Sequence, residues 1–183
     1  MDFEFYVAGL WSGTIGERVA VHVSIDPHLG SLKFDVDMDS LPTVSYQDGH
    51  EVVVQFHVDN FANNRTFYTD SNGLEMQKRI LNYRPTWNVS LNYQDQLENI
   101  TANYYPINSA ISMKDVNSDR IFTVMNDRPQ GGSALEEGMI ELMQNRRIPS
   151  DDGRGMGESL DEKDEHGDGI RVPATYHVQI FRE

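Results

Sequence analysis

Apolar residues recur at every second position in several short runs, and this alternation constrains the fold more than any other feature of the sequence. The clearest runs are 19–25, 32–38 and 52–58. Successive side chains of a strand point to opposite faces, so such runs bury one face of an antiparallel sheet and leave the other in water. Shorter extended runs lie at 66–69, 104–113, 121–125 and 176–181. The pattern predicts an all-β antiparallel sandwich.

Turn-forming residues separate these runs. They lie at Asp26-Pro27, Leu41-Pro42, Asp48-Gly49, 70–73, 129–132 and 151–153. Gly, Pro, Asn and Asp favour chain reversal for distinct stereochemical reasons, which supports many short strands over a few long ones. No internal repeat or domain boundary is evident, so we predict a single domain over residues 1–183. The acidic, glycine-punctuated segment 158–169 is predicted to be a mobile loop within it.

Two segments are ambiguous. Residues 74–80 follow Ser71-Asn-Gly, and the pattern there allows a helical turn or two. Residues 133–136 resemble a helix capping box that leads into 137–143. Gly138 would weaken such a helix by about 1 kcal/mol, and 139–143 fits a strand equally well. The pattern alone leaves that second segment undecided.

Charge and composition exclude several classes of protein. The formal net charge of −14 argues against nucleic-acid binding and against docking on an anionic membrane, since both need clustered Lys and Arg. The chain has no cysteine, which excludes disulfide scaffolds, zinc fingers and thiol catalysis. With 38% apolar residues, 8 Phe, 8 Tyr and 2 Trp, it can build a real core.

Three Asn-x-Ser/Thr sequons begin at Asn64, Asn88 and Asn99, and they indicate passage through the secretory pathway. No stretch approaches the roughly 18 apolar residues of a membrane helix, and the first residues lack the character of a signal peptide. A chain with sequons and no signal peptide is best explained as a piece of a longer protein.

A search for catalytic or metal-binding motifs gives little. The pairs His57/Asp59 and His166/Asp168 have a spacing that metal ligands can use, but no further His cluster accompanies them, so we interpret His57 and Asp59 as solvent-face residues. The acidic segment 158–169 lacks the spacing of a calcium loop. Aromatic residues in 83–87 and 103–108 could stack on sugars, although core packing is the commoner use. Segment 151–155 fits either a self-contained turn or a functional loop.

Six segments occur together in a fixed order, and they carry a specific resemblance. They are Phe67-Tyr-Thr-Asp-Ser-Asn-Gly73, Tyr83-Arg-Pro-Thr-Trp87, Asn103-Tyr-Tyr-Pro-Ile-Asn108, Asp127-Arg-Pro-Gln-Gly-Gly-Ser133, Glu141-Leu-Met143 with Arg146-Arg147, and Asp151-Asp-Gly-Arg-Gly155. Together they resemble the C-terminal half of the family 38 glycoside hydrolases, and the lysosomal-type α-mannosidases more than the Golgi type. The resemblance covers about residues 32–160.

The resemblance implies a fold and a parent enzyme. Family members are zinc-dependent, retaining α-mannosidases that trim mannose from N-glycans. Their zinc ligands, nucleophile and acid/base residue lie in an N-terminal catalytic domain with no counterpart here, so the resemblance implies no catalytic residue and no bound metal in this chain. The C-terminal half is a galactose-mutarotase-like β super-sandwich, which favours a strand at 139–143.

The same resemblance implies a role for Arg154, whose counterpart in the family reaches the rim of the active site. Arg154 is therefore expected to bind substrate. The expected partners are the N-terminal catalytic domain of the same enzyme and a mannose-containing glycan, in a lysosomal, vacuolar or secreted location. The metal-ligand role of the family's His-x-Asp is not carried over to His57/Asp59.

Two other functions are compatible with the sequence. One is a free-standing carbohydrate-binding module built on the same sandwich, without hydrolytic activity. The other is a β-sandwich interaction domain without a ligand. The order of the six segments favours a non-catalytic part of an α-mannosidase over both.

Overall fold

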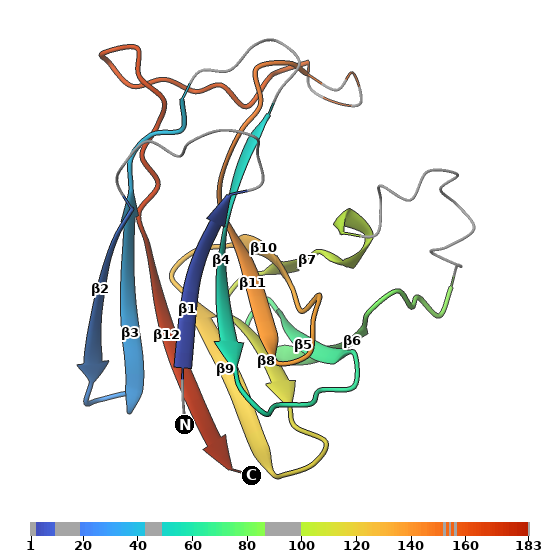
Figure 1. The fold of residues 1–183 in the computed structure, drawn as a ribbon. Helices are drawn as coiled ribbons and strands as arrows, with labels where there is room; N and C mark the ends of the chain where they lie inside the picture. Colours follow the sequence, from blue (N-terminus) through green and yellow to red (C-terminus); the bar gives the residue numbers. More distant parts are fainter. Residues whose placement is uncertain are drawn as a thin grey trace.

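The computed structural model describes residues 3–9, 19–42, 49–86, 100–151, 153, 155 and 157–182, and for residues 3–9 the course of the backbone (Figure 1). The secondary structure in this part of the chain is nearly all β, with one short 3₁₀ helix, η2 (Thr101–Asn103). No helix among the described residues is long and apolar enough to cross a membrane.

The strands of the described residues form two sheets. The five-stranded sheet contains, from edge to edge, β1 (Phe3–Gly9), β4 (His50–Val58), β11 (Met139–Arg147), β10 (Gln130–Ser133) and β7 (Tyr105–Ile107). The seven-stranded sheet contains β2 (Val19–Asp26), β3 (Ser31–Met38), β12 (Ala174–Arg182), β9 (Arg120–Asn126), β8 (Ala110–Lys114), β5 (Thr66–Ser71) and β6 (Glu75–Ile80). Every recorded strand pair is antiparallel.

The core lies between the two sheets. Phe56 of β4 meets Phe34 of β3 edge-to-face with ring centroids 5.3 Å apart, and Tyr176 of β12 at 5.6 Å. Phe56 and Tyr176 are completely buried. Rings from both sheets therefore share one apolar layer, in an arrangement that aromatic pairs prefer. The predicted all-β sandwich is confirmed.

The alternating runs form strands as predicted, including β2, β3 and β4, and the strand at 139–143 is confirmed as the start of β11. The run at 104–113 is two strands, β7 and β8, which belong to different sheets and are separated by Asn108 and Ser109. The single extended run was therefore wrong at that point.

The helical turn that the pattern allowed at 74–80 does not form. Asn72 and Gly73 both have positive φ (52° and 70°) and reverse the chain, so that β6 pairs with β5 in a hairpin. Asn-Gly readily adopts this conformation, and pairing with an adjacent strand overrides weak local helix propensity. Between β10 and β11 the chain likewise turns, and Gly138 there has a positive φ of 72°. A Cβ at this residue would lie 2.7 Å from the Val58 carbonyl oxygen, so the position requires glycine.

Residues 158–169 are mostly exposed, as expected for a surface loop. Two isolated bridges, Ile148 to Leu160 and Lys163 to Gly169, tie the segment down. Its mobility stays a prediction.

Candidate functional site

The loop at 149–159 carries the segment that the sequence singled out for substrate binding. It leaves the end of β11 and returns at Leu160, whose carbonyl oxygen accepts a hydrogen bond from the Ile148 amide at 2.9 Å. Arg147, only 5% exposed, stabilises the base of the same loop. Its Nε donates to Asp161 Oδ1 at 2.6 Å and its Nη1 to the Leu41 carbonyl at 2.5 Å. The two ends of the loop are therefore fixed to the sandwich.

The described residues at the tip of this loop, Asp151, Gly153 and Gly155, are exposed. Asp151 accepts a hydrogen bond from the Gly153 amide at 2.8 Å. Gly153 has the positive φ (71°) that its type predicts. Arg154, the predicted substrate-binding residue, lies outside the described residues, so its role stays a prediction.

The possible metal ligands lie at the surface or in a local turn. His57 lies on the outer face of β4, 3.4 Å from Gln55 Oε1, and Asp59 is exposed in the following turn, where both line an open cleft of about 460 Å³. The backbone amides of His166 and Asp168 donate to Asp164 Oδ1 in a local turn. Among the described residues no three His, Asp or Glu side chains come together as metal ligands.

One of the three sequons lies in the described part of the chain. Asn64 is exposed in a tight turn in which the Thr66 amide donates to the Asn63 carbonyl at 2.9 Å. Both central residues, Asn64 and Arg65, have positive φ (47° and 59°), which Asn tolerates well. Asn88 and Asn99 lie outside the described residues.

Asn64 borders a polar cleft of about 680 Å³ on the outside of the molecule. The cleft combines one aromatic side chain with amides, hydroxyls and charges. Its lining residues are Asn63, Asn64, Thr66, Tyr68, Lys78, Lys114, Asp115, Val116, Asn117, Ser118 and Asp119.

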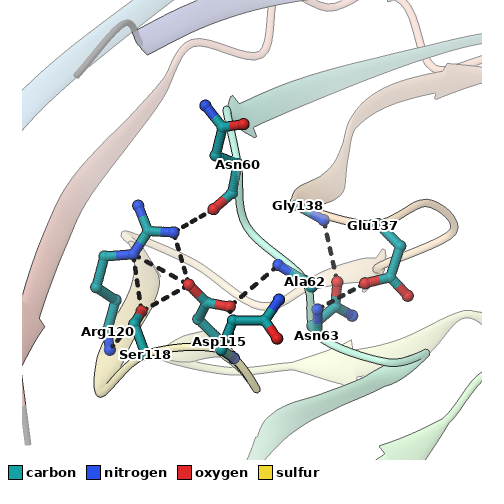
Figure 2. A network of polar contacts seen from close by, with 9 residues as sticks. Asn60, Ala62, Asn63, Asp115, Ser118, Arg120, Glu137 and Gly138 are labelled. Carbon is teal, nitrogen blue, oxygen red and sulfur yellow. Dashed lines mark hydrogen bonds and ion pairs between the residues drawn. The ribbon is translucent and has the colours of Figure 1, made fainter.

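One wall of this cleft is held by a buried carboxylate (Figure 2). Asp115, 2% exposed, accepts hydrogen bonds from the Ser118 hydroxyl at 2.6 Å and from Arg120 Nη2 at 2.6 Å. Its other oxygen accepts from the Ala62 and Asn117 amides. The Ser118 hydroxyl, the Arg120 guanidinium and these amides hold the pKa of Asp115 well below its usual range, against the opposing effect of burial.

Another part of the lining, the turn that carries Asn64, is held by Glu137 and Asn63 (Figure 2). The Glu137 carboxylate accepts from the backbone amides of Asn63, Asn64 and Arg65 at 2.6, 3.0 and 2.9 Å. The buried Asn63 side chain accepts from the Gly138 amide and donates to the Thr66 carbonyl, both at 3.0 Å. Contacts distant in sequence therefore fix both walls.

Sequence reasoning missed a second buried carboxylate, Asp70. It lies near the end of β5, just before the hairpin turn, and accepts backbone hydrogen bonds from Gly73, Asn108, Ser109 and Ala110 at 2.8 to 3.2 Å. Burial raises the pKa of Asp70, but these four donors outweigh it and lower the pKa to about 2. Two of the six ordered segments thus meet at one carboxylate. The sequence signal for this site was an Asp shortly before Asn-Gly, and that motif alone does not show whether the carboxylate is buried.

The aromatic residues considered for sugar stacking have different surroundings. Tyr105 is buried, and the guanidinium carbons of Arg79 and Arg84 lie 4.3 and 4.2 Å from its ring centroid. Tyr104 donates its hydroxyl to the buried Glu141. Tyr83 is 55% exposed, and Trp87 lies outside the described residues. The ring of Tyr105 therefore holds the fold together through cation–π contacts and is closed to a ligand.

Two packed antiparallel sheets with loops at their ends define an all-β sandwich. Residues 10–154 match the model of the glycosyl hydrolases family 38 C-terminal domain. The chain belongs to this family.

Several relatives of this chain are alpha-mannosidases by name. The chain is 45% identical to lysosomal alpha-mannosidase of Bos taurus over 135 residues, and 46% identical to that of Homo sapiens over 132 residues. It is 37% identical to alpha-mannosidase of Canavalia ensiformis over 139 residues. These matches cover 74%, 72% and 73% of this chain, and 12%, 12% and 13% of the respective relatives. The chain thus spans about an eighth of the length of the relatives that it matches.

Proposed function

We propose that this chain is the C-terminal, non-catalytic part of a zinc-dependent, retaining α-mannosidase that trims mannose from N-glycans. The family match and the names of the relatives support an α-mannosidase. The described residues offer no cluster that fits zinc, so its ligands would belong to the catalytic domain of the parent protein. By itself the chain should not hydrolyse α-mannosides.

An apolar strip at the edge of the seven-stranded sheet supports packing against that catalytic domain. Val23 of β2 pairs with Phe34 of β3, so both side chains lie on the core face of the sheet. Phe34 is buried, whereas Val21, Val23 and Ile25 are 38%, 50% and 74% exposed. In Figure 1 the two strands extend past β1, the edge of the other sheet. The core face thus continues beyond its cover, and we infer that the catalytic domain covers it.

The strip is tested in the full-length parent protein by Val23→Asp. An unpaired carboxylate buried under the catalytic domain is strongly unfavourable, so the yield of folded protein should fall several-fold. Leu74→Asp is the matched control, because Leu74 is 88% exposed in the β5–β6 turn, away from the strip. Equal yields of the two variants would contradict packing at this strip.

We further propose that Arg154 completes the rim of the active site. The loop that contains it is fixed at its base by Arg147 and by the Ile148–Leu160 bridge, which supports a fixed approach toward a neighbour. An arginine carries five N–H donors and accepts none, so it can donate to the hydroxyls of a mannoside and hold the substrate.

The proposed location is the lysosome, the vacuole or the outside of the cell. The names of the relatives support a lysosomal location, and the sequons at Asn64, Asn88 and Asn99 support a glycoprotein. Mass spectrometry of glycopeptides from the secreted full-length protein reports which of the three asparagines are modified. Three unmodified sites would contradict the secretory route.

A further inference from the structure

Asn64 and the polar cleft beside it form one continuous surface. The side chain of Asn64 is exposed and borders the cleft of about 680 Å³. The turn is rigid, because the Glu137 carboxylate accepts hydrogen bonds from three of its backbone amides. A group attached to Asn64 would therefore leave the protein at a fixed point at the mouth of the cleft.

The cleft has the chemistry of a sugar site. Tyr68 is half-buried on the outer face of β5, opposite Lys78 of β6 and Ser112 of β8. An aromatic ring with hydrogen-bonding groups around it suits a sugar, which has apolar C–H faces and polar edges. Amides, hydroxyls and carboxylates of the two turns supply those groups, from Asn117, Ser118 and Asp119 among others.

The charge of the cleft favours a neutral ligand over an anion. Lys78 and Lys114 line it together with the exposed Asp119. Asp115 also lines it but is paired with Arg120 at 2.6 Å. The positive charge is thus partly balanced inside the cleft, and the whole chain carries −14. An anion would gain little from such a field.

The walls are preformed. The Asp115 turn and the Asn64 turn are joined directly, since the Val116 amide donates to the Ala62 carbonyl at 2.7 Å and the Ala62 amide donates to Asp115. A ligand would therefore not have to order these loops on binding, which removes one of the usual entropic costs of association.

We propose that Asn64 carries an N-linked glycan and that the first sugars of this glycan lie in the cleft against Tyr68. The inference rests on the proposed secretory route. A tethered glycan has a high effective concentration at the cleft, so weak contacts suffice to hold it there, whereas a free sugar would need far stronger ones. The glycan is docked for most of the time and shields the cleft from solvent.

The modification itself needs a lipid-linked oligosaccharide diphosphate as donor. The bond between the anomeric carbon and the phosphate oxygen breaks, and a bond from that carbon to Asn64 Nδ2 forms. The lipid diphosphate leaves with the electron pair, and the amide nitrogen loses one proton. Thr66 supplies the hydroxyl of the sequon, and its Oγ1 lies 3.3 Å from the Asn64 carbonyl oxygen.

The test uses the full-length parent protein, secreted from a eukaryotic host and kept folded. Glycopeptide mass spectrometry measures how fast an endoglycosidase releases the glycan at each sequon. The glycan at Asn64 should be released about fivefold faster in Tyr68→Ala than in the wild-type protein, since loss of the ring shifts the equilibrium toward the undocked glycan. Tyr68→Phe keeps the ring and should behave like wild type, as should Leu74→Ala in the nearby hairpin turn.

Glycans at Asn88 and Asn99, where present, are internal controls and should be released at unchanged rates. If Tyr68→Ala does not fold, Lys78→Ala on the neighbouring strand tests the same surface. Equal release at Asn64 in all variants would overturn the inference, as would an unmodified Asn64 in a protein glycosylated at Asn88 or Asn99; both results leave the proposed secretory route intact. A free oligosaccharide that binds Asn64→Gln through Tyr68 would overturn it in favour of an external ligand.

Discussion

Two aspartate turns that resemble each other in sequence serve different ends. Asp70 and Asp151 each begin a polar turn that ends in glycine, and each belongs to a segment that carries the family resemblance. Asp70 is 5% exposed and accepts four backbone hydrogen bonds, three of them from residues about 40 positions away. Asp151 is exposed, and from the described residues it accepts one, from two residues away. Distant partners, more than the local motif, therefore distinguish a buried carboxylate that holds the fold from an exposed one at the tip of a loop.

Asp115 extends this comparison, because it belongs to none of the six segments and has more distant partners than Asp151. Asp115→Ala should lower the free energy of unfolding by about 3 kcal/mol, since it leaves the partly buried Arg120 guanidinium beside Phe61 and Asn60 without its counter-charge. Urea denaturation of the chain measures this. A loss below about 1 kcal/mol would contradict the inference that distant hydrogen-bond partners decide how much a carboxylate stabilises the fold. The double variant Asp115→Ala/Arg120→Met should recover part of the loss.

Asp70→Asn should lower the free energy of unfolding by about 2 kcal/mol, because an amide nitrogen would face the Gly73 amide or one of the other three donors. Asp151→Asn is the matched control and should stay within about 0.5 kcal/mol of wild type. The same urea titrations compare the two. Equal losses of unfolding free energy in the two variants would mean that Asp70 and Asp151 stabilise the fold to the same extent.

The pKa of Asp70 gives the same contrast as a dependence on pH. Its folded value of about 2 lies below the unfolded value of about 3.9, so the unfolded chain takes up the proton first. The stabilisation, about 2 kcal/mol, is complete above about pH 5 and is lost as the pH falls from about 4 to about 2. In Asp70→Asn this part of the acid-induced loss should be absent, and in Asp151→Asn it should remain.

Arg154→Ala should have the smallest effect on stability, within about 0.5 kcal/mol of wild type, because the described residues on either side of it, Gly153 and Gly155, are exposed. In the full-length parent protein we expect KM for an α-mannoside to rise about threefold to tenfold through loss of substrate hydrogen bonds. Arg182→Ala, at the exposed end of β12, is the control. Unaltered kinetics in Arg154→Ala would remove the proposed role of the loop.

Much of the fold could be predicted from the sequence, because strand periodicity is local. Val54, Phe56 and Val58 alternate with Gln55 and His57, and Val54 and Phe56 are completely buried in β4 as that pattern predicts. The run in β2 alternates as clearly, yet Val23 and Ile25 are exposed, because β2 is an edge strand that extends past the other sheet. Periodicity indicates which side chains lie on the same face of a strand. Whether that face is buried depends on how the two sheets are arranged.

The candidate sites were harder to predict, because their partners come from distant segments. The residues next to Asp115 in the sequence do not indicate its hydrogen bond with the Ala62 amide. Those next to Asn64 do not indicate that the Glu137 carboxylate stabilises its turn. The segment 74–80 was ambiguous for a related reason, since pairing with β5 in a hairpin, and not local propensity, decides its structure.

The order of strands in the seven-stranded sheet has a consequence for synthesis. β12, close to the end of the sequence, lies between β3 and β9, in the middle of the sheet. A ribosome adds roughly 5–20 residues per second, so for several seconds the growing polypeptide has two half-sheets, β2–β3 and β9–β8–β5–β6, with a gap between them. Their open edges can pair with the wrong strand until Ala174–Arg182 emerges. The seven-stranded sheet is therefore incomplete from the synthesis of β9 until that of β12, and a stop codon just before residue 174 would leave it permanently in that state.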